Sequence, residues 1–180
     1  MQKLLERMIR AAKLDATLYE EVEADKGAFR QAIIVVLISS AAAGLGSVTI
    51  SGFQALIFGS IFSLAGWYIW AYLTYFIGTK LLPEAQTKTD PGELLRTIGF
   101  SSSPGVLRVL GIIPGFSSII FPVAGIWMLV AMVIAVRQAL DYKSTGRAVG
   151  VCLIGWIIQA VIYALLVAVF IGPRMAPSSL

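Results

Sequence analysis

Residues 31–79 read QAIIVVLISSAAAGLGSVTISGFQALIFGSIFSLAGWYIWAYLTYFIGT and contain no charged side chain over 49 positions. A transmembrane helix needs about 20 predominantly apolar residues, so this run is long enough for two. Turn-forming residues gather at Gly44–Ser47 and at Ser51–Gly52, and such clusters mark a reversal of the chain. The stretch therefore predicts a helical hairpin with spans near 29–48 and 53–78.

Two further uncharged runs follow, of 28 residues (109–136) and 26 residues (148–173). Across all 180 residues, 58% are hydrophobic and 13% are charged, whereas soluble domains average about 45–50% and 25%. So few charges cannot cover the surface of a soluble protein of this size. We therefore expect an all-α, polytopic integral membrane protein, with two more spans near 118–136 and 148–171.

One more span, the third of five in chain order, is expected over 94–113. Arg96 and Arg108 lie within it, and Pro104-Gly105 interrupts it. Its start is well marked, because Asp90-Pro91-Gly92-Glu93 supplies a helix N-cap, a proline at the first helical position and an acid three residues after the cap. Hydroxyls of Ser101–Ser103 can accommodate the broken helix by bonding the freed carbonyls. A re-entrant or interfacial segment here would reduce the count from five spans to four.

The distribution of Lys and Arg distinguishes these two counts. Cytoplasmic segments concentrate positive charge, and five spans with the N-terminus inside place twelve Lys and Arg residues inside and two outside. Five spans with an external C-terminus are therefore favoured, in the cytoplasmic (inner) membrane of a prokaryote. The expected organisation is a cytoplasmic segment over 1–27, a membrane domain over 28–172 and a short external tail over 173–180.

The N-terminal segment begins with an amphipathic helix, in which Leu4, Leu5, Met8, Ile9 and Ala12 recur at helical spacing. Charged residues occupy the other face, so we expect this helix to lie in the headgroup layer of the membrane.

Several kinds of chemistry are excluded by composition. The chain has no His, no Asn and one Cys, which removes His-based triads, His metal sites and cysteine clusters. No nucleophile with a base, metal set or poised acid pair is evident in the spans. We expect no enzymatic activity, no cofactor and no metal.

Five short motifs resemble the Yip (Ypt-interacting protein) family, in its prokaryotic branch, over nearly all the chain after about residue 15. They are Leu18-Tyr19-Glu20-Glu21-Val22-Glu23, Gly99-Phe100-Ser101-Ser102-Ser103-Pro104-Gly105, Gly125-Ile126-Trp127, Val136-Arg137-Gln138-Ala139-Leu140-Asp141 and Ser144-Thr145-Gly146-Arg147-Ala148. The resemblance implies five helical spans with a cytoplasmic N-terminus. Eukaryotic members are associated with vesicle trafficking and prenylated Rab/Ypt GTPases, but their Asp-Leu-Tyr-Gly-Pro motif corresponds here to Thr17-Leu18-Tyr19-Glu20-Glu21, so GTPase binding is not carried over.

Polar residues near the cytoplasmic ends of the spans are candidates for docking a partner. They are Tyr19, Glu20, Glu21, Glu23, Arg137, Asp141 and Arg147. Arg137 and Asp141 stand four residues apart, which is the spacing of an ion pair on a helix. We expect this pair to fix the turn and orientation after the fourth span, and docking of a partner is the alternative for it.

Arg108 is the charge deepest in a predicted span. A charge there suggests contact with a lipid phosphate or a partner, although its side chain can also snorkel to the external surface. Gly59, Ser63 and Gly66 allow close helix packing, within the bundle or against a second copy.

Two functions remain open from the sequence. The protein organises the membrane or recruits a partner at its cytoplasmic face, or it is an accessory subunit packed laterally on a larger membrane complex. A small-molecule transporter is least favoured, because the three uncharged runs offer no acid to couple ions. Expected partners are membrane lipids, other integral membrane proteins or a homo-oligomer, and a cytoplasmic protein, but no nucleic acid.

Overall fold

The computed structural model describes residues 2–48 and 54–170, and within these ranges the chain forms helices and no strand. The elements are α1 (Gln2–Ala12), α2 (Ala16–Ala24), α3 (Ala28–Gly46), α5 (Gln54–Phe76), the π-helix η1 (Ile77–Leu81), α6 (Pro91–Ser101), the 3₁₀-helix η2 (Ser103–Ile112), α7 (Ser117–Ala139) and α8 (Thr145–Phe170). The prediction of an all-α fold is confirmed. The external tail 173–180 lies outside the described residues.

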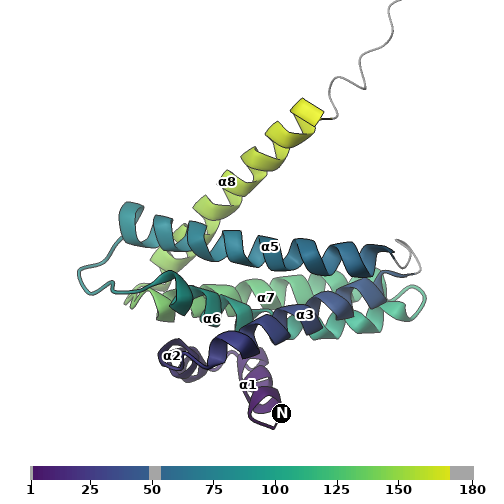
Figure 1. Ribbon diagram of the computed structural model, residues 1–180, viewed down its shortest axis with the longest axis horizontal. Coiled ribbons are helices and arrows are strands. Elements are labelled where there is room, and N and C mark those ends of the chain that lie inside the picture. The colour runs from purple at the N-terminus through teal and green to yellow at the C-terminus, as the bar shows by residue number, and fades with distance from the viewer. Residues whose placement is uncertain (1, 49–53, 171–180) are drawn as a thin grey trace, which may run out of the picture.

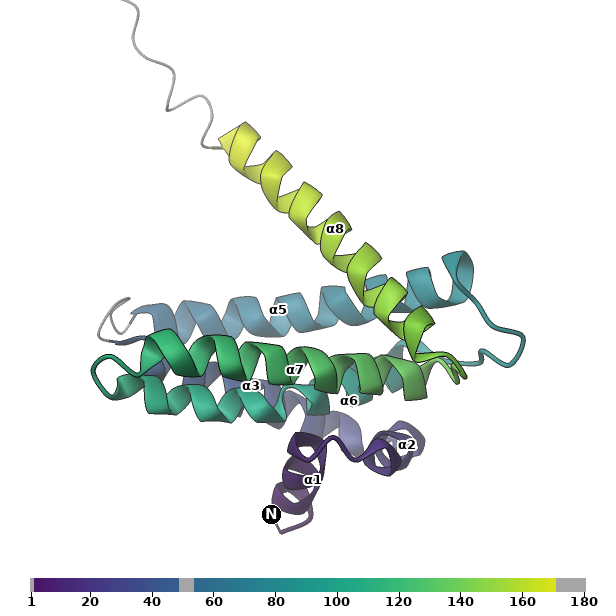
Figure 2. The same ribbon diagram turned by 180° about the vertical axis from the view of Figure 1, so that it is seen from behind.

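The long helices form one bundle with two appendages. Helices α3, α5 and α7 run along the long axis together with α6 and η2, while α8 leaves the bundle at an angle (Figure 1). On the opposite side of the bundle, α1 and α2 lie below it (Figure 2). The segments joining η1 to α6 and α7 to α8 meet at the same end of the bundle as α2.

Four helices are long and apolar enough to cross a membrane, namely Ala28–Gly46, Gly59–Leu81, Ser117–Ala139 and Thr145–Ile162. The segment expected as the third span is divided into α6 and η2, so it is not among them. Eleven α-helical residues followed by ten 3₁₀ residues rise about 36 Å, which exceeds the roughly 30 Å hydrocarbon core. The structure is a multi-pass membrane fold, and the count of five spans stays a prediction.

The division of this segment follows the sequence signals. Asp90 caps α6, accepting from the backbone N of Glu93, while the Glu93 carboxylate accepts from the backbone N of Asp90. At the break, Ser101 Oγ donates to the carbonyl of Ile98 and Ser103 Oγ to that of Phe100, both at 2.7 Å. The hydroxyls bond carbonyls around the break, as predicted, and Pro104 begins the second part.

Close backbone contacts join α6 and η2 to α3. A Cβ built on Gly99, Gly105 or Gly46 would lie 2.7 Å from Ala32 Cβ, 2.0 Å from Ser39 Oγ or 1.9 Å from the Arg108 carbonyl oxygen, respectively. Gly99 and Gly105 are six residues apart, whereas the residues that they contact on α3, Ala32 and Ser39, are seven apart. A 3₁₀-helix rises more per residue than an α-helix, which accounts for the difference.

The expectation that Gly44–Ser47 form the hairpin turn is corrected by the structure. Gly44 and Gly46 lie in the last turn of α3, where they are buried. Ser51 and Gly52 lie outside the described residues.

The N-terminal helices fold back onto the bundle. Between α1 and α2, Leu14 adopts a φ of 63°, and the Asp15 N–H bonds the Arg10 carbonyl, as in a Schellman ending. Ala11 is fully buried, and the Trp127 Nε1 of α7 donates to the Ala12 carbonyl at 2.7 Å. Leu5 and Ile9 face outward. The helix exists as predicted, while its placement in the headgroup layer stays a prediction.

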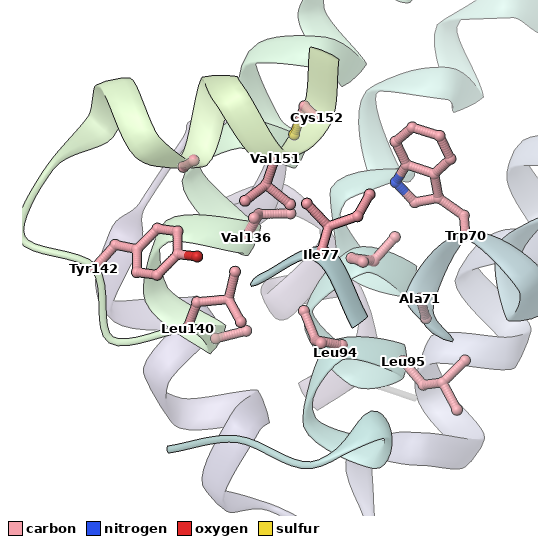
Figure 3. Close-up of a cluster of buried hydrophobic side chains, with 13 residues drawn as sticks. Trp70, Ala71, Ile77, Leu94, Leu95, Val136, Leu140, Tyr142, Val151 and Cys152 are labelled. Carbon is pink, nitrogen blue, oxygen red and sulfur yellow. The ribbon is translucent and has the colours of Figure 1, made fainter. Parts of the chain in front are cut away.

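The larger hydrophobic core lies at the end of the bundle where η1, α6, α7 and α8 meet (Figure 3). Leu140 packs so closely on Gly78 that a Cβ there would lie 2.5 Å from it. The wider turn of η1 carries its carbonyls toward Tyr142, whose hydroxyl lies 3.0 Å from the Gly78 oxygen and 2.7 Å from that of Leu82. This core fixes the loop after α7 and thereby positions the site described next.

Candidate functional site

A cavity of about 600 Å³ lies at this end of the bundle, between the end of α2, the start of α6 and the loop after α7. We call it the acidic cavity, because four of its residues are carboxylic acids. Its lining residues are Glu20, Glu23, Ala24, Glu93, Arg137, Gln138, Asp141, Tyr142 and Lys143.

Helix α2 is held at the cavity by a buried arginine of α6. Arg96 is 6% exposed, and its guanidinium donates to the backbone carbonyls of Val22 and Glu23. These carbonyls end α2, where a positive charge also complements the helix dipole. At the other edge of the helix, Gln138 Nε2 donates to Glu20 Oε1 at 2.7 Å. Two side chains far apart in sequence thus fix one wall of the cavity.

The opposite wall is the turn that ends α7. Asp141 adopts a φ of 53°, and the backbone N–H of Tyr142 bonds the carbonyl of Arg137 at 2.9 Å, which together form a Schellman motif. Arg137 and Asp141 form no ion pair in the described part of the chain. Arg137 instead donates to the carbonyls of Tyr142 and Lys143, because the left-handed residue at 141 turns the chain back over the helix end.

A second loop supports this turn. Glu84 accepts from the backbone N of Lys143 at 3.0 Å and pairs with Arg147 at 3.4 Å. Gln86 Nε2 donates to the carbonyl of Asp141 at 2.9 Å. Arg147, a predicted docking residue, therefore ties two loops together and does not line the acidic cavity.

The electrostatics of the cavity are dominated by its carboxylates. Burial and the negative charges of Glu93 and Asp141 raise the pKa of Glu23 to about 7, and the charge of Arg96 acts in the opposite direction. Arg137 is occupied by carbonyls, so Lys143 is the one lining cation whose side chain makes no bond among the described residues. The arrangement is suited to receiving positive charge.

We expect Glu23→Gln to stabilise the protein at pH 8 and to have no such effect at pH 4. The folded protein holds this proton up to about pH 7, while the unfolded chain releases it near 4.5, so stability falls as the pH rises through that interval. Screening at a partly exposed group limits the gain to about 1 kcal/mol, or about 2–4 °C. Melting temperatures at both pH values test this, with exposed Glu6→Gln as control. An equal change at pH 4 and pH 8 would count against a raised pKa.

Two other docking candidates have structural positions. Tyr19 is fully buried among α1, α2 and the bundle, so it cannot touch a partner directly. Glu21 accepts from Arg7 at 2.7 Å and from Arg10 at 2.5 Å, and these two arginines lower its pKa. Of the seven predicted docking residues, the structure brings Glu20, Glu23, Arg137 and Asp141 together at one cavity.

The remaining predicted residues lie outside the acidic cavity. Gly59 and Gly66 have no atom of the described residues within 4 Å of a built Cβ, and together with Ser63 they line cavities beside α5. Their part in helix packing stays a prediction. Arg108 lines one of the same cavities.

Glu93, Gln138, Tyr142 and Lys143 also line the cavity, although they are not among the individually predicted docking residues. Glu93 was assigned to the cap of α6, and it does make that bond. A signal was present, because each of the four adjoins the predicted cytoplasmic end of a span. The sequence alone does not show that α2 packs beside the ends of these spans.

Among the described residues, no group of three or more His, Cys, Asp or Glu side chains could hold a metal ion.

A comparison with family models matches the chain to the Yip1 domain over residues 16–171. The chain belongs to the Yip1 family. The match begins at the first residue of α2 and ends just after α8, so it covers the bundle and the wall of the acidic cavity. Comparisons with curated proteins and with solved structures give no match. Membership agrees with a non-enzymatic, multi-pass membrane protein whose helices contact lipid.

Proposed function

We propose that this Yip1-family protein organises the membrane by recruiting a cytoplasmic partner, which presents a basic segment to the acidic cavity. The observation that carries this proposal is the convergence of Glu20, Glu23, Glu93 and Asp141 from three separate segments on one 600 Å³ space. Complementary charge gives such docking its specificity and its rate of association.

The side of the membrane is part of the proposal. The positive-inside distribution assigns the end of the bundle with α2 to the cytoplasm of a prokaryotic cell. Support comes from the fold, because α2 and the loops that join η1 to α6 and α7 to α8 gather at that end (Figures 1 and 2). The C-terminus would then be external.

The test uses the double variant Glu20→Gln, Asp141→Asn, which removes two charges and preserves the fold. Glutamine keeps the acceptor for Gln138, and asparagine tolerates the left-handed conformation at 141. We expect recovery of a soluble partner in a mild-detergent pull-down to fall about tenfold, which corresponds to about 1.4 kcal/mol. Membrane insertion should be unchanged. The matched control is Glu6→Gln, because Glu6 is exposed and lies outside the cavity.

A second candidate function is an accessory subunit packed laterally on a membrane complex. It is favoured by α8, which leans away from the bundle and leaves Leu153, Ile157 and Val161 exposed. Mass spectrometry of the same pull-down separates the two functions. A stoichiometric set of integral membrane proteins, retained by the double variant, would replace recruitment with the accessory role.

A further inference from the structure

A second cavity, of about 310 Å³, lies within the bundle and away from the acidic cavity. Its walls come from α3, α5, η2 and α7. We call it the arginine cavity, and its lining residues are Val36, Ser39, Ser40, Ala43, Gly44, Ser47, Gly59, Ser63, Ser102, Arg108, Phe121 and Met128. Five serines and one arginine are among these lining residues.

The 3₁₀ geometry of η2 brings Arg108 to this cavity. Side chains three residues apart eclipse one another in a 3₁₀-helix, so Ser102, Gly105, Arg108 and Gly111 share one face. Gly105 and Gly111 lie against Ser39 and Gly46 of α3, which orients that face toward α3. In an α-helix the same positions would be spread around the axis, and Arg108 would not share a face with Gly105 and Gly111.

Arg108 has no counter-ion among the residues that the structure describes. Its Nε is buried without a hydrogen-bond partner among the described residues, and its nearest favourable contact is the Phe121 ring, 5.7 Å from the guanidinium carbon. All ten acids of the sequence lie within 6–25, within 84–93 or at 141, and none of these segments lines the cavity. An unpaired charge among membrane helices is costly, so an anion from outside the chain would stabilise it.

Hydroxyl donors face the same space. Within the described residues, Ser39, Ser63 and Ser102 donate no side-chain hydrogen bond, whereas Ser40 and Ser47 bond carbonyls of their own helix. A guanidinium with several hydroxyls is the donor set that recognises phosphate, because the planar guanidinium can bond two phosphate oxygens at once. Gly59 leaves room beside it, since no atom of the described residues lies within 4 Å of its built Cβ.

We propose that the arginine cavity binds a phosphate group, either that of an anionic phospholipid whose headgroup enters between α3 and α5, or a free phosphate ion. Arg108 is the charged ligand, and Ser39, Ser63 and Ser102 are hydroxyl donors. This site is independent of the proposed recruitment, because no residue lines both cavities.

The test measures the thermal unfolding of the full-length protein in mild detergent with three probes. These are short-chain phosphatidylglycerol, inorganic phosphate, and diacylglycerol with the same acyl chains. We expect phosphatidylglycerol to raise the melting temperature, and Arg108→Gln to weaken its apparent affinity about ten- to a hundredfold. Arg30→Gln is the matched control, because Arg30 is an exposed arginine outside this cavity. Stabilisation by inorganic phosphate as well would identify a free-anion site, and stabilisation by phosphatidylglycerol alone a lipid site.

A second variant keeps the arginine and fills the space. Gly59→Leu has room on α5, so it should fold and lose the response to phosphatidylglycerol while Arg108 remains. Equal responses of Gly59→Leu and the unaltered protein would overturn the cavity as the binding site. A response to diacylglycerol as large as that to phosphatidylglycerol would overturn phosphate recognition.

Discussion

Replacing Gly46 with alanine should destabilise the membrane bundle by about 3 kcal/mol or more. The new Cβ would lie 1.9 Å from the Arg108 carbonyl oxygen and 2.9 Å from its carbonyl carbon. Overpacking usually costs about 1–3 kcal/mol, and here the obstructing atoms are backbone, which no change of rotamer can move. Helix α3 and η2 must therefore separate. We expect loss of a monodisperse peak in size-exclusion chromatography and a large fall in melting temperature.

The matched control for this variant is Gly66→Ala on α5. No atom of the described residues lies within 4 Å of its built Cβ, and alanine is favoured over glycine in a helix by about 1 kcal/mol. This variant should therefore be as stable as the unaltered protein or slightly more stable. Gly105→Ala should be intermediate, because its obstacles are the Ser39 hydroxyl and the Met128 sulfur at 2.0 and 2.9 Å, and both belong to side chains that can rotate away. Equal melting temperatures for the variants at 46 and 66 would contradict the contact between α3 and η2.

Replacing Arg7 with methionine should release α1 and α2 from each other at a cost of about 3 kcal/mol. Arg7 is 2% exposed, and its guanidinium bonds Glu21 at 2.7 Å, Asp25 at 2.8 Å and Gln31 at 2.9 Å. Breaking a buried ion pair costs about 3–5 kcal/mol. The lower figure applies because the two carboxylates, each more than a third exposed, can regain water. Limited proteolysis of the N-terminal segment, together with thermal unfolding, measures the release.

The pH dependence of this network gives the variant a second readout. Arg7 lowers the pKa of Glu21 and of Asp25 below their ordinary 4.5 and 3.8. The stability they contribute is therefore present above those values and is lost as the pH falls through the lowered ones. The unaltered protein should become protease-sensitive at its N-terminus in acid, and Arg7→Met already at neutral pH. Lys13→Met, at an exposed position of the same segment, should resist at neutral pH. A protected N-terminus in Arg7→Met would show that other contacts hold α1.

Much of the fold could be predicted from the sequence, because these features depend on composition and on interactions between residues close together in the chain. Uncharged runs predicted the long apolar helices, since partition into a bilayer depends on composition. The cap at Asp90 and the break after Ser101 were also predicted, because each involves bonds between residues three or four apart. The sequence assigned Arg7 to an exposed helix face, and there it was wrong, because the carboxylates that bury it lie 14 and 18 residues away.

The candidate site was predicted only in part for the same reason. Glu20, Glu23, Arg137 and Asp141 were identified by their position at the ends of predicted spans, and the family by short motifs in order. Their meeting in one cavity depends on Arg96 bonding α2 across 73 and 74 residues. Arg137 bonds the carbonyls of Tyr142 and Lys143 because the chain reverses after α7. By itself, therefore, the sequence determined that this is a helical membrane protein of Yip type, with its caps, its broken helix and its charge distribution. The tertiary structure alone decided which acids share a cavity, that η2 is a 3₁₀-helix turning Arg108 toward serines, and that Gly46 touches backbone, because these contacts depend on how distant segments pack.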